Sequence, residues 1–324
     1  MNRRSIIKSS SYCSSVNQDG IALLLVLWVL TVLMVIVLSF SLTARTETYS
    51  TLSFREGVEK KFLAEAGLQR GISEIFYRRQ NLNVEGGDFW KTDGTPYSDR
   101  LGEGEYSVRI IDESGKIDIN MLNDSSGIIL KNLLINAGVG DDTANTIVDS
   151  VLDWKDKNEG MHRLNGAGDD YYASLPNPYK VKHADFDTVE ELMLIKGVTP
   201  EILFGSGKGK GIIDFLTVYS RVPTISIKAA PREVLVAVPG ITPEIADAII
   251  SSRADNRIIN FQEVGLPPQG GLFFNMMDSS TFSLESVGIK GDGKTGYKVK
   301  ATVRIEADNK YKFVYYKSPV TVNQ

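Results

Sequence analysis

The block of acidic and amide side chains between residues 153 and 172 is the part of the chain whose composition could do chemistry. It contains Asp153, Asp156 and Asn158 and then, after a short gap, Asp169 and Asp170, with several glycines nearby. Calcium in proteins takes about six to eight oxygen ligands from carboxylates, amides and carbonyls. A loop without disulfides gains order when it binds such an ion. The block therefore predicts structural calcium, with a solvated acidic loop as the alternative.

The rest of the chain shows no evident catalytic residues. The two histidines, His162 and His183, share no metal-binding spacing, and the single cysteine, Cys13, precedes a long apolar run. Residues 288–295 match the phosphate-binding pattern G-x-x-x-x-G-K-[ST], but a strand pattern follows where that motif needs a helix. No nucleophile has an evident base, so we expect neither an enzyme nor a nucleotide-binding protein.

Length and charge limit the remaining function classes. The chain has 324 residues, of which 42% are hydrophobic and 23% charged, which is globular composition with room for two or three folded units. The formal charge is −4, and the isoelectric point lies near 5.5. A chain without a global basic field is not expected to have nucleic acid as its main partner. Membrane or protein partners are favoured.

The N-terminus predicts a membrane anchor. Residues 1–20 are polar and include basic side chains, whereas residues 21–44 contain no charged residue. An apolar helix of about 20 residues spans the bilayer core. Because the basic residues precede the run, the N-terminus is expected in the cytoplasm and the rest on the far side. A simple signal anchor is one interpretation of this pattern.

A second interpretation follows from the residues at the boundary. A polar leader that ends at Gly20, followed by an apolar helix from Ile21, resembles the signal of type IV prepilins and type II secretion pseudopilins. The resemblance implies that prepilin peptidase cuts between these two residues and methylates the new amine. Most such proteins have glutamate at the fifth mature position, where this chain has Leu25. A carboxylate in hydrocarbon is costly unless it is paired, and in a pilin stack its partner is taken to be the terminal amine of the subunit above. The topmost subunit has no subunit above it, so a chain without this carboxylate suits that position. This absence is characteristic of the general secretion pathway protein K family.

The stalk and the strands that follow fit the same family. Residues 45–79 contain no proline and carry apolar residues at helical spacing, which predicts a continued helix or, alternatively, a coiled coil. Within it, Gly67 and Gly71 are expected to permit close approach to partner subunits. Residues 81–104 are interpreted as a long loop and residues 105–111 as a strand.

Residues 112–120 resemble the family pattern D-x-x-G-K-[IL]-[ND]-[IL]-N, in which a turn at Gly115 joins two short extended pieces. Beyond it, patterns predict helical segments near 125–137, 141–154, 187–195 and 211–219, and then a helical pair that ends near Arg253. The last strands are predicted at 282–287, 297–307 and 311–317. We expect strand 105–111 to pair with these distant strands, leaving the helices as an insertion.

Two turns, at residues 195–201 and 238–244, resemble helix-hairpin-helix motifs, whose amides and cations bind phosphate in DNA-binding proteins. They support an alternative function as a membrane-anchored DNA receptor of a competence-type system. Five glutamates around the turns offset the nearby cations, which favours a structural role similar to a sterile alpha motif (SAM), and no nucleic acid is expected. These glutamates are Glu190, Glu191, Glu201, Glu233 and Glu244.

The family resemblance also bears on the acidic block. Protein K relatives carry a block D-W-x-D-x-D followed by G-A-E-[DN]-x-Y that supplies calcium ligands, and Asp153, Asp156 and Asp170 fall on or close to it. Asn158 replaces the third aspartate, and Gly168 replaces the glutamate.

The resemblance implies an α+β fold, in which an N-terminal transmembrane and stalk helix lies on a pilin-like antiparallel sheet interrupted by SAM-like or helix-hairpin-helix-like modules. The expected parts are a leader (1–20), a transmembrane helix (21–44), the stalk and first pilin-like part (45–115), two helical modules (116–222 and 223–280) and the C-terminal strands (281–324).

The implied function is that of a minor pseudopilin of the type II secretion system, which caps the pseudopilus tip and takes part in protein secretion across the outer membrane. Its implied partners are minor pseudopilins I and J, the major pseudopilin and prepilin peptidase. The implied location is the bacterial inner membrane, with a single pass, a cytoplasmic N-terminus and a periplasmic C-terminal domain.

Overall fold

The computed structural model describes residues 19–81, 89–158, 162–207, 210–254, 265, 267–276, 279–291, 295–306 and 310–320. The leader, apart from its last two residues, lies outside this described part. The chain divides into two compact units, Met1–Val58 and Glu59–Gln324. Helix α1 (Asp19–Gln80) supplies the described part of the first unit and begins the second. The helix expected over residues 45–79 is therefore confirmed.

The N-terminal part of α1 is apolar and exposed. Its most apolar stretch has a mean hydropathy of 3.3 and contains no buried residue, and the helix is long enough to cross a membrane. Large side chains such as Leu24, Trp28 and Phe40 are exposed in the protein alone. This composition fits a lipid environment, because exposed apolar surface on this scale is rare in water.

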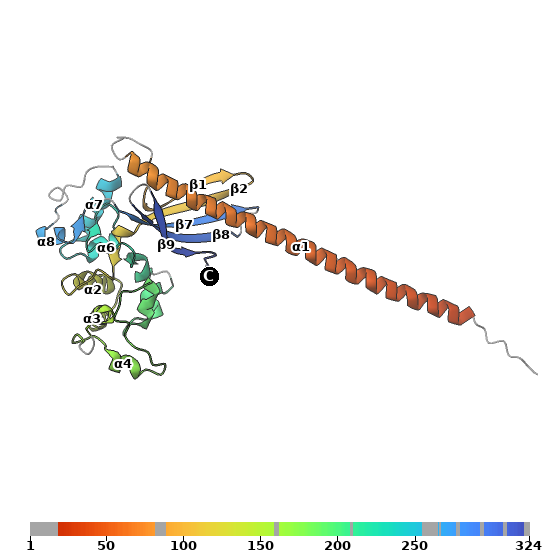
Figure 1. Cartoon of the computed structure of the whole chain (residues 1–324), viewed down its shortest axis with the longest axis horizontal. Coiled ribbons are helices and arrows are strands. Elements are labelled where there is room, and N and C mark those ends of the chain that lie inside the picture. Colours follow the sequence, from red (N-terminus) through yellow and green to blue (C-terminus); the bar gives the residue numbers. More distant parts are fainter. Residues whose placement is uncertain are drawn as a thin grey trace, which may run out of the picture. The chain divides into compact units, whose positions relative to one another are not determined.

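Five antiparallel strands form the main sheet of the second unit (Figure 1). They are β1 (Asp93–Leu101), β2 (Gly104–Asp112), β7 (Thr281–Lys290), β8 (Tyr297–Ile305) and β9 (Tyr311–Lys317), in the order β1-β2-β7-β8-β9. The register between β2 and β7 runs from Gly104 opposite Lys290 to Asp112 opposite Phe282. This pairing confirms that the strand at 105–111 joins the distant C-terminal strands and that the helical segments are an insertion.

Strand β1 corrects one expectation, since residues 81–104 were interpreted as a loop. The segment contains Gly94 and Pro96, which disfavour strands, and its side chains are mostly exposed. It pairs along β2 at the edge of the sheet, with a register shift between Asp93 and Pro96. An edge position tolerates proline because one side of the strand makes no ladder hydrogen bonds.

The part of α1 from residue 59 onward packs on the sheet and forms one hydrophobic core with it. A Cβ atom on Gly67 would overlap Ser286 and Tyr106, and one on Gly71 would overlap Leu284. Their close approach is therefore to the chain's own sheet. The buried residues of this core are Ala64, Leu68, Ile72, Ile75, Ile110, Phe282, Leu284, Val299, Ala301, Val303 and Ile305.

The insertion leaves the sheet after β2 and returns at β7. Its longer helices are α2 (Gly127–Asn136), α3 (Asp141–Lys155) and α7 (Pro243–Ala254), and its shorter ones are α4 (Asp169–Ala173), α5 (Pro200–Phe204), α6 (Arg232–Ala237) and α8 (Pro268–Gly271). Its described residues also form the 3-10 helices η1 (Glu113–Gly115), η2 (Val189–Leu194) and η3 (Ile212–Phe215). The described part of the insertion also contains short parallel strand pairs, β3 (Ile117–Asp118) with β4 (Leu216–Thr217) and β5 (Ile225–Ser226) with β6 (Phe274–Asn275).

The predicted helices are confirmed at α2, α3, α6 and α7. The segment at 187–195 is a 3-10 helix, and the helix expected at 211–219 is wrong, because that segment is η3 followed by β4. Ile117 and Leu216, opposite one another in the β3–β4 pair, are both buried. One hydrophobic core runs through both predicted modules, from Ile117 to Phe274. The division into two modules at residue 222 stays a prediction.

Candidate functional site

The family pattern at residues 112–120 lies where the sheet meets the insertion. Asp112 ends β2 and caps η1, its carboxylate accepting hydrogen bonds from the backbone N and hydroxyl of Ser114 at 2.9 and 2.7 Å. Gly115 packs so closely on Ala229 that a Cβ atom would overlap its backbone. These contacts explain why the pattern requires an aspartate and a glycine at these places.

The second half of the pattern joins distant segments. Asp118 accepts hydrogen bonds from the Ser220 hydroxyl at 2.9 Å and the Arg221 backbone at 2.7 Å. The Asn120 side chain donates to the Phe186 carbonyl at 2.9 Å and accepts from the Phe186 amide at 2.8 Å. All of these polar groups are buried or half-buried and mutually satisfied, which is how buried polar networks fix one arrangement. The pattern therefore acts as a junction.

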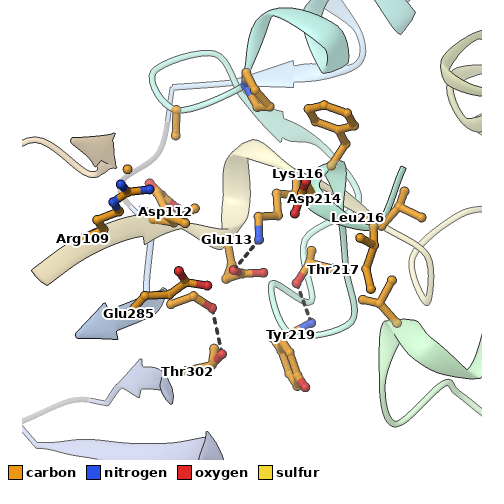
Figure 2. A pocket seen from close by; sticks show the side chains of 18 of the residues that line it. Arg109, Asp112, Glu113, Lys116, Asp214, Leu216, Thr217, Tyr219, Glu285 and Thr302 are labelled. Atoms are coloured by element: carbon orange, nitrogen blue, oxygen red, sulfur yellow. Dashed lines mark hydrogen bonds and ion pairs between the residues drawn. The ribbon is translucent and has the colours of Figure 1, made fainter. Parts of the chain in front are cut away.

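A cavity of about 470 Å³ lies beside this junction, lined by residues of the sheet and of the insertion (Figure 2). Glu113 and Glu285 face it, and the Lys116 ammonium reaches the Glu113 carboxylate at 2.8 Å. Glu285 pairs with Lys298 at 2.9 Å and Lys300 at 3.4 Å. The lining thus holds opposite charges that already have partners within the chain.

Burial and pairing set the pKa values of these carboxyl groups. Burial raises the pKa of Asp112, and the hydrogen bonds from Ser114 only partly offset that rise. Burial acts the same way on Glu113, but the neighbouring Lys116 outweighs it and lowers the pKa of this carboxyl. Glu285 also has a lowered pKa, because its two lysines outweigh burial. At neutral pH, Glu113 and Glu285 are therefore ionised and paired.

The predicted calcium ligands occupy two separate places. Asp153 lies in the last turn of α3 and is buried, and Asp156 caps the end of that helix. Asn158 donates to Asp156 Oδ1 from its backbone and side-chain nitrogens, both at 3.0 Å. Asp169 begins α4 and accepts a hydrogen bond from the Val181 amide at 2.8 Å. Asp170 lies in the same first turn of α4.

A guanidinium group occupies the cation position beside Asp153. Nη1 of Arg163 lies 2.7 Å from Asp153 Oδ1 and 3.9 Å from Asp156 Oδ2, and its Nε lies 2.7 Å from Asp124 Oδ1. Among the residues that the structure describes, no three His, Cys, Asp or Glu side chains form a group that could hold a metal ion. The described geometry therefore fits a calcium cage poorly, and calcium binding stays a prediction. The sequence patterns did not indicate Arg163, because its partners are 7 to 39 residues away in the chain.

The two turns that resemble helix-hairpin-helix motifs have matching geometry. Gly197 and Gly240 adopt φ values of 87° and 83°, which glycine reaches without strain. Thr199 and Thr242 follow two residues later and accept hydrogen bonds from the backbone of α5 and α7. Glu201 and Glu244, in the first turn of each helix, have pKa values lowered by hydrogen bonds with backbone groups and with these threonines.

Two of the cations near these turns point inward. Lys196 donates to the Gly166 carbonyl at 3.2 Å and lies over the Tyr171 ring, and Arg253 donates to the Ala230 carbonyl at 2.9 Å. Phosphate binding needs free amides and free cations at the turn. Here carboxylates already lie at the helix starts, and these two cations have internal partners.

The processing residues Gly20 and Ile21 lie in the first turn of α1, next to the part of the leader outside the described residues. Cleavage between them stays a prediction. The segment that resembles a phosphate-binding loop lies in the β7–β8 hairpin, with residues 292–294 outside the described part. A strand follows it, as expected.

Comparisons with known proteins agree on one family. Residues 115–204 match the family model of the type II secretion system protein K. Type II secretion system protein K of Pseudomonas aeruginosa is 24% identical over 249 residues, which cover 73% of this chain and 72% of that protein. The corresponding protein of Pectobacterium carotovorum is 28% identical over 206 residues, covering 57% of this chain and 60% of the relative.

A solved structure shares the fold. A chain in the crystal structure of the GspK-GspI-GspJ complex from enterotoxigenic Escherichia coli matches with a TM-score of 0.63 and 12% identity, over 85% of this chain and 100% of that one. The matched family model begins within the junction pattern, at Gly115, and covers the acidic block, and this chain's fold combines a long helix, an antiparallel sheet and inserted helices. The chain is therefore similar in sequence to protein K of the type II secretion system, and it shares the fold of a chain in the solved GspK-GspI-GspJ complex.

Proposed function

We propose that the chain is a minor pseudopilin of the protein K family and caps the tip of the type II pseudopilus. The observation that carries the proposal is the place of the insertion. It leaves β2 at Asp112 and returns at Thr281, and there the end of α1 meets it, with Arg79 donating to the Ser279 carbonyl at 3.3 Å. The bulk of the insertion therefore lies at the end of the sheet where α1 ends. A subunit stacked beyond that end would meet about 170 residues of inserted chain.

The fifth residue of the expected mature chain supports the same position. Leu25 lies on the exposed apolar part of α1, where pseudopilins ordinarily have a glutamate that pairs with the neighbouring subunit. A subunit without this carboxylate offers no partner to a terminal amine above it. The topmost place needs no such partner.

Its partners are proposed by analogy. The solved relative was crystallised in a complex with GspI and GspJ. We expect this chain to assemble with the I and J minor pseudopilins of its own system, above the major pseudopilin, and so to take part in protein secretion across the outer membrane. The occupied helix starts and the inward cations at the two turns give no support to a DNA receptor.

Co-purification tests the assembly. When the full chain is co-expressed with the I and J proteins and extracted in mild detergent, it should elute with both as one complex. Duplex DNA should not be retained at physiological salt, where binding driven by phosphate contacts falls steeply with ionic strength. Salt-sensitive DNA retention by the folded chain, with neither I nor J bound, would reject the cap function and favour the DNA receptor.

The processing and orientation proposals are tested by separate measurements. We expect prepilin peptidase to remove residues 1–20, so mass spectrometry of protein extracted from the inner membrane should find a chain that starts at methylated Ile21. The variant Gly20→Leu, which places a bulky side chain at the cut, should retain Met1. Protease added to spheroplasts should degrade the C-terminal domain if that domain is periplasmic. An intact N-terminus in a peptidase-positive strain would favour a simple signal anchor.

A further inference from the structure

The acidic block contains its own cation. Arg163 joins three aspartates from two parts of the insertion, Asp124 before α2 and Asp153 and Asp156 at the end of α3. We refer to these four residues as the Arg163 bridge. All four belong to the described part of the chain, and the bridge is independent of the tip-cap function.

Asp153 is the residue that requires a cation. Its side chain is only 4% exposed, and it lies in the last turn of α3, where the helix dipole disfavours negative charge. A buried carboxylate is costly unless it is paired and hydrogen-bonded. Arg163 supplies both requirements, because its backbone N lies 3.2 and 3.1 Å from the two carboxylate oxygens and its Nη1 lies 2.7 Å from Oδ1.

The backbone is shaped around this contact. Gly166 lies against the Asp153 carboxylate so closely that a Cβ atom would overlap Oδ2. The Gly166 amide donates to the Arg163 carbonyl at 3.0 Å, which closes a turn over the pair. The segment 163–166 is thus folded to present the guanidinium and the backbone amide of Arg163 beside one carboxylate.

A divalent ion and this guanidinium exclude one another. Calcium binds carboxylate oxygen at about 2.3–2.6 Å, whereas Nη1 already lies 2.7 Å from Asp153 Oδ1. The ion and the guanidinium therefore cannot both contact this oxygen, and their positive charges would repel each other. The fork of the guanidinium also matches the arrangement of partners, since Nε contacts Asp124 while Nη1 contacts Asp153.

We propose that Arg163 takes the place of a structural calcium ion at Asp153, so that this end of the insertion is held by an internal ion-pair network and needs no metal there. The side chain acts as a positioning residue that ties the end of α3 to the segment entering α2. The predicted ligands Asp153 and Asp156 are, on this proposal, arginine partners.

Thermal melting of the full-length protein in detergent tests the proposal. The wild-type melting temperature should be the same in calcium and in the chelator EGTA. Arg163→Gln should melt several degrees lower in EGTA, because Asp153 keeps its buried charge without a partner. Calcium should then restore part of that loss, since the ion can approach the vacated carboxylates.

A matched control comes from the same unit of the chain. Arg232 makes two hydrogen bonds to Asp247, at 2.6 and 3.0 Å, but both side chains are about half exposed. Arg232→Gln should change the melting temperature little, because exposed ion pairs contribute little. If Arg163→Gln does not fold, Arg163→Lys, which keeps the charge without the fork, should still fold and should melt below both the wild type and Arg232→Gln.

Two results would overturn the proposal. One is a wild-type melting temperature that rises in calcium as much as that of Arg163→Gln, which would show that the ion binds in the presence of the guanidinium. The other is an Arg163→Gln protein as stable as Arg232→Gln.

Discussion

Two regions of the molecule are stabilised in opposite ways. One is the contact between α1 and the sheet, and the other is the Arg163 bridge of the insertion. In the first, side chains are missing where the backbones meet: Gly67 and Gly71 face β2 and β7, and Gly288 of β7 lies against the backbone of Lys60 and Ala64. In the second, charged side chains are added, and Arg163 reaches three carboxylates. The first contact depends on shape and the second on charge.

This difference predicts different sensitivities. A close-packed contact does not tolerate an added methyl group, because interiors are dense and backbones cannot move apart independently. A paired-charge contact tolerates changes in size better than the loss of one partner, which leaves a buried charge uncompensated. Variants that add one carbon or remove one charge therefore distinguish the two regions.

The largest effect is expected at Gly288. A Cβ atom there would overlap the backbone oxygen of Lys60 and approach the Ala64 nitrogen, so Gly288→Ala must push α1 off the sheet. We expect a loss of about 4 kcal/mol in the free energy of unfolding, at the upper end for overpacking. Chemical denaturation followed by circular dichroism measures it.

Gly57 on the same helix is the control. A Cβ atom on Gly57 would have no heavy atom within 4 Å, so Gly57→Ala should be neutral or stabilise by up to about 1 kcal/mol through helix propensity. Equal, small effects at both positions would contradict the close contact between α1 and β7.

A smaller, pH-dependent effect is expected at the cavity. Lys116 lowers the pKa of Glu113 against the effect of burial, so Glu113 contributes stability above its unfolded-state pKa and loses it as the pH falls through the folded-state value. Lys116→Met should cost about 3 kcal/mol at neutral pH. The cost should shrink as the pH falls, because Glu113 of the variant, buried without the ammonium, takes up a proton and then needs no cationic partner. Melting temperatures measured from pH 3 to 8 test this sign.

Lys298→Met gives the comparison for that cavity. Its partner Glu285 retains Lys300 at 3.4 Å and is less buried than Glu113, so the loss at neutral pH should be smaller. A Lys116→Met cost that is constant across the pH range would show that the ammonium acts through packing rather than through the charge of Glu113.

Much of the fold followed from local patterns. The strands β7, β8 and β9 show alternating polarity, and the apolar and helical spacing of α1 extends through residue 79. The pairing of β2 with the C-terminal strands was also predictable, though not the choice of β7 among them, because no other strand pattern lay near it in sequence. The family pattern at residues 112–120 located the junction but not its bonds.

Sequence patterns failed where pairing with another segment decides the local conformation. Strand β1 has weak strand propensity and forms because the edge of β2 offers hydrogen bonds. Residues 216–217 form β4 because Ile117 and Asp118 lie beside them, which overrides the helical pattern. In both cases the partner strand that stabilises the segment lies outside the residues whose pattern was used to predict it.

Local composition and hydrophobic period were enough to predict an apolar anchor, a stalk helix, antiparallel strands near the C-terminus and a carboxylate-rich block. The contacts that these features make could be known only from the tertiary structure. Gly67 and Gly71 face the chain's own β2 and β7, and Asp153 contacts a guanidinium ten residues further along. Close approach and charge pairing depend on positions in space, and the folding of the insertion fixes those positions.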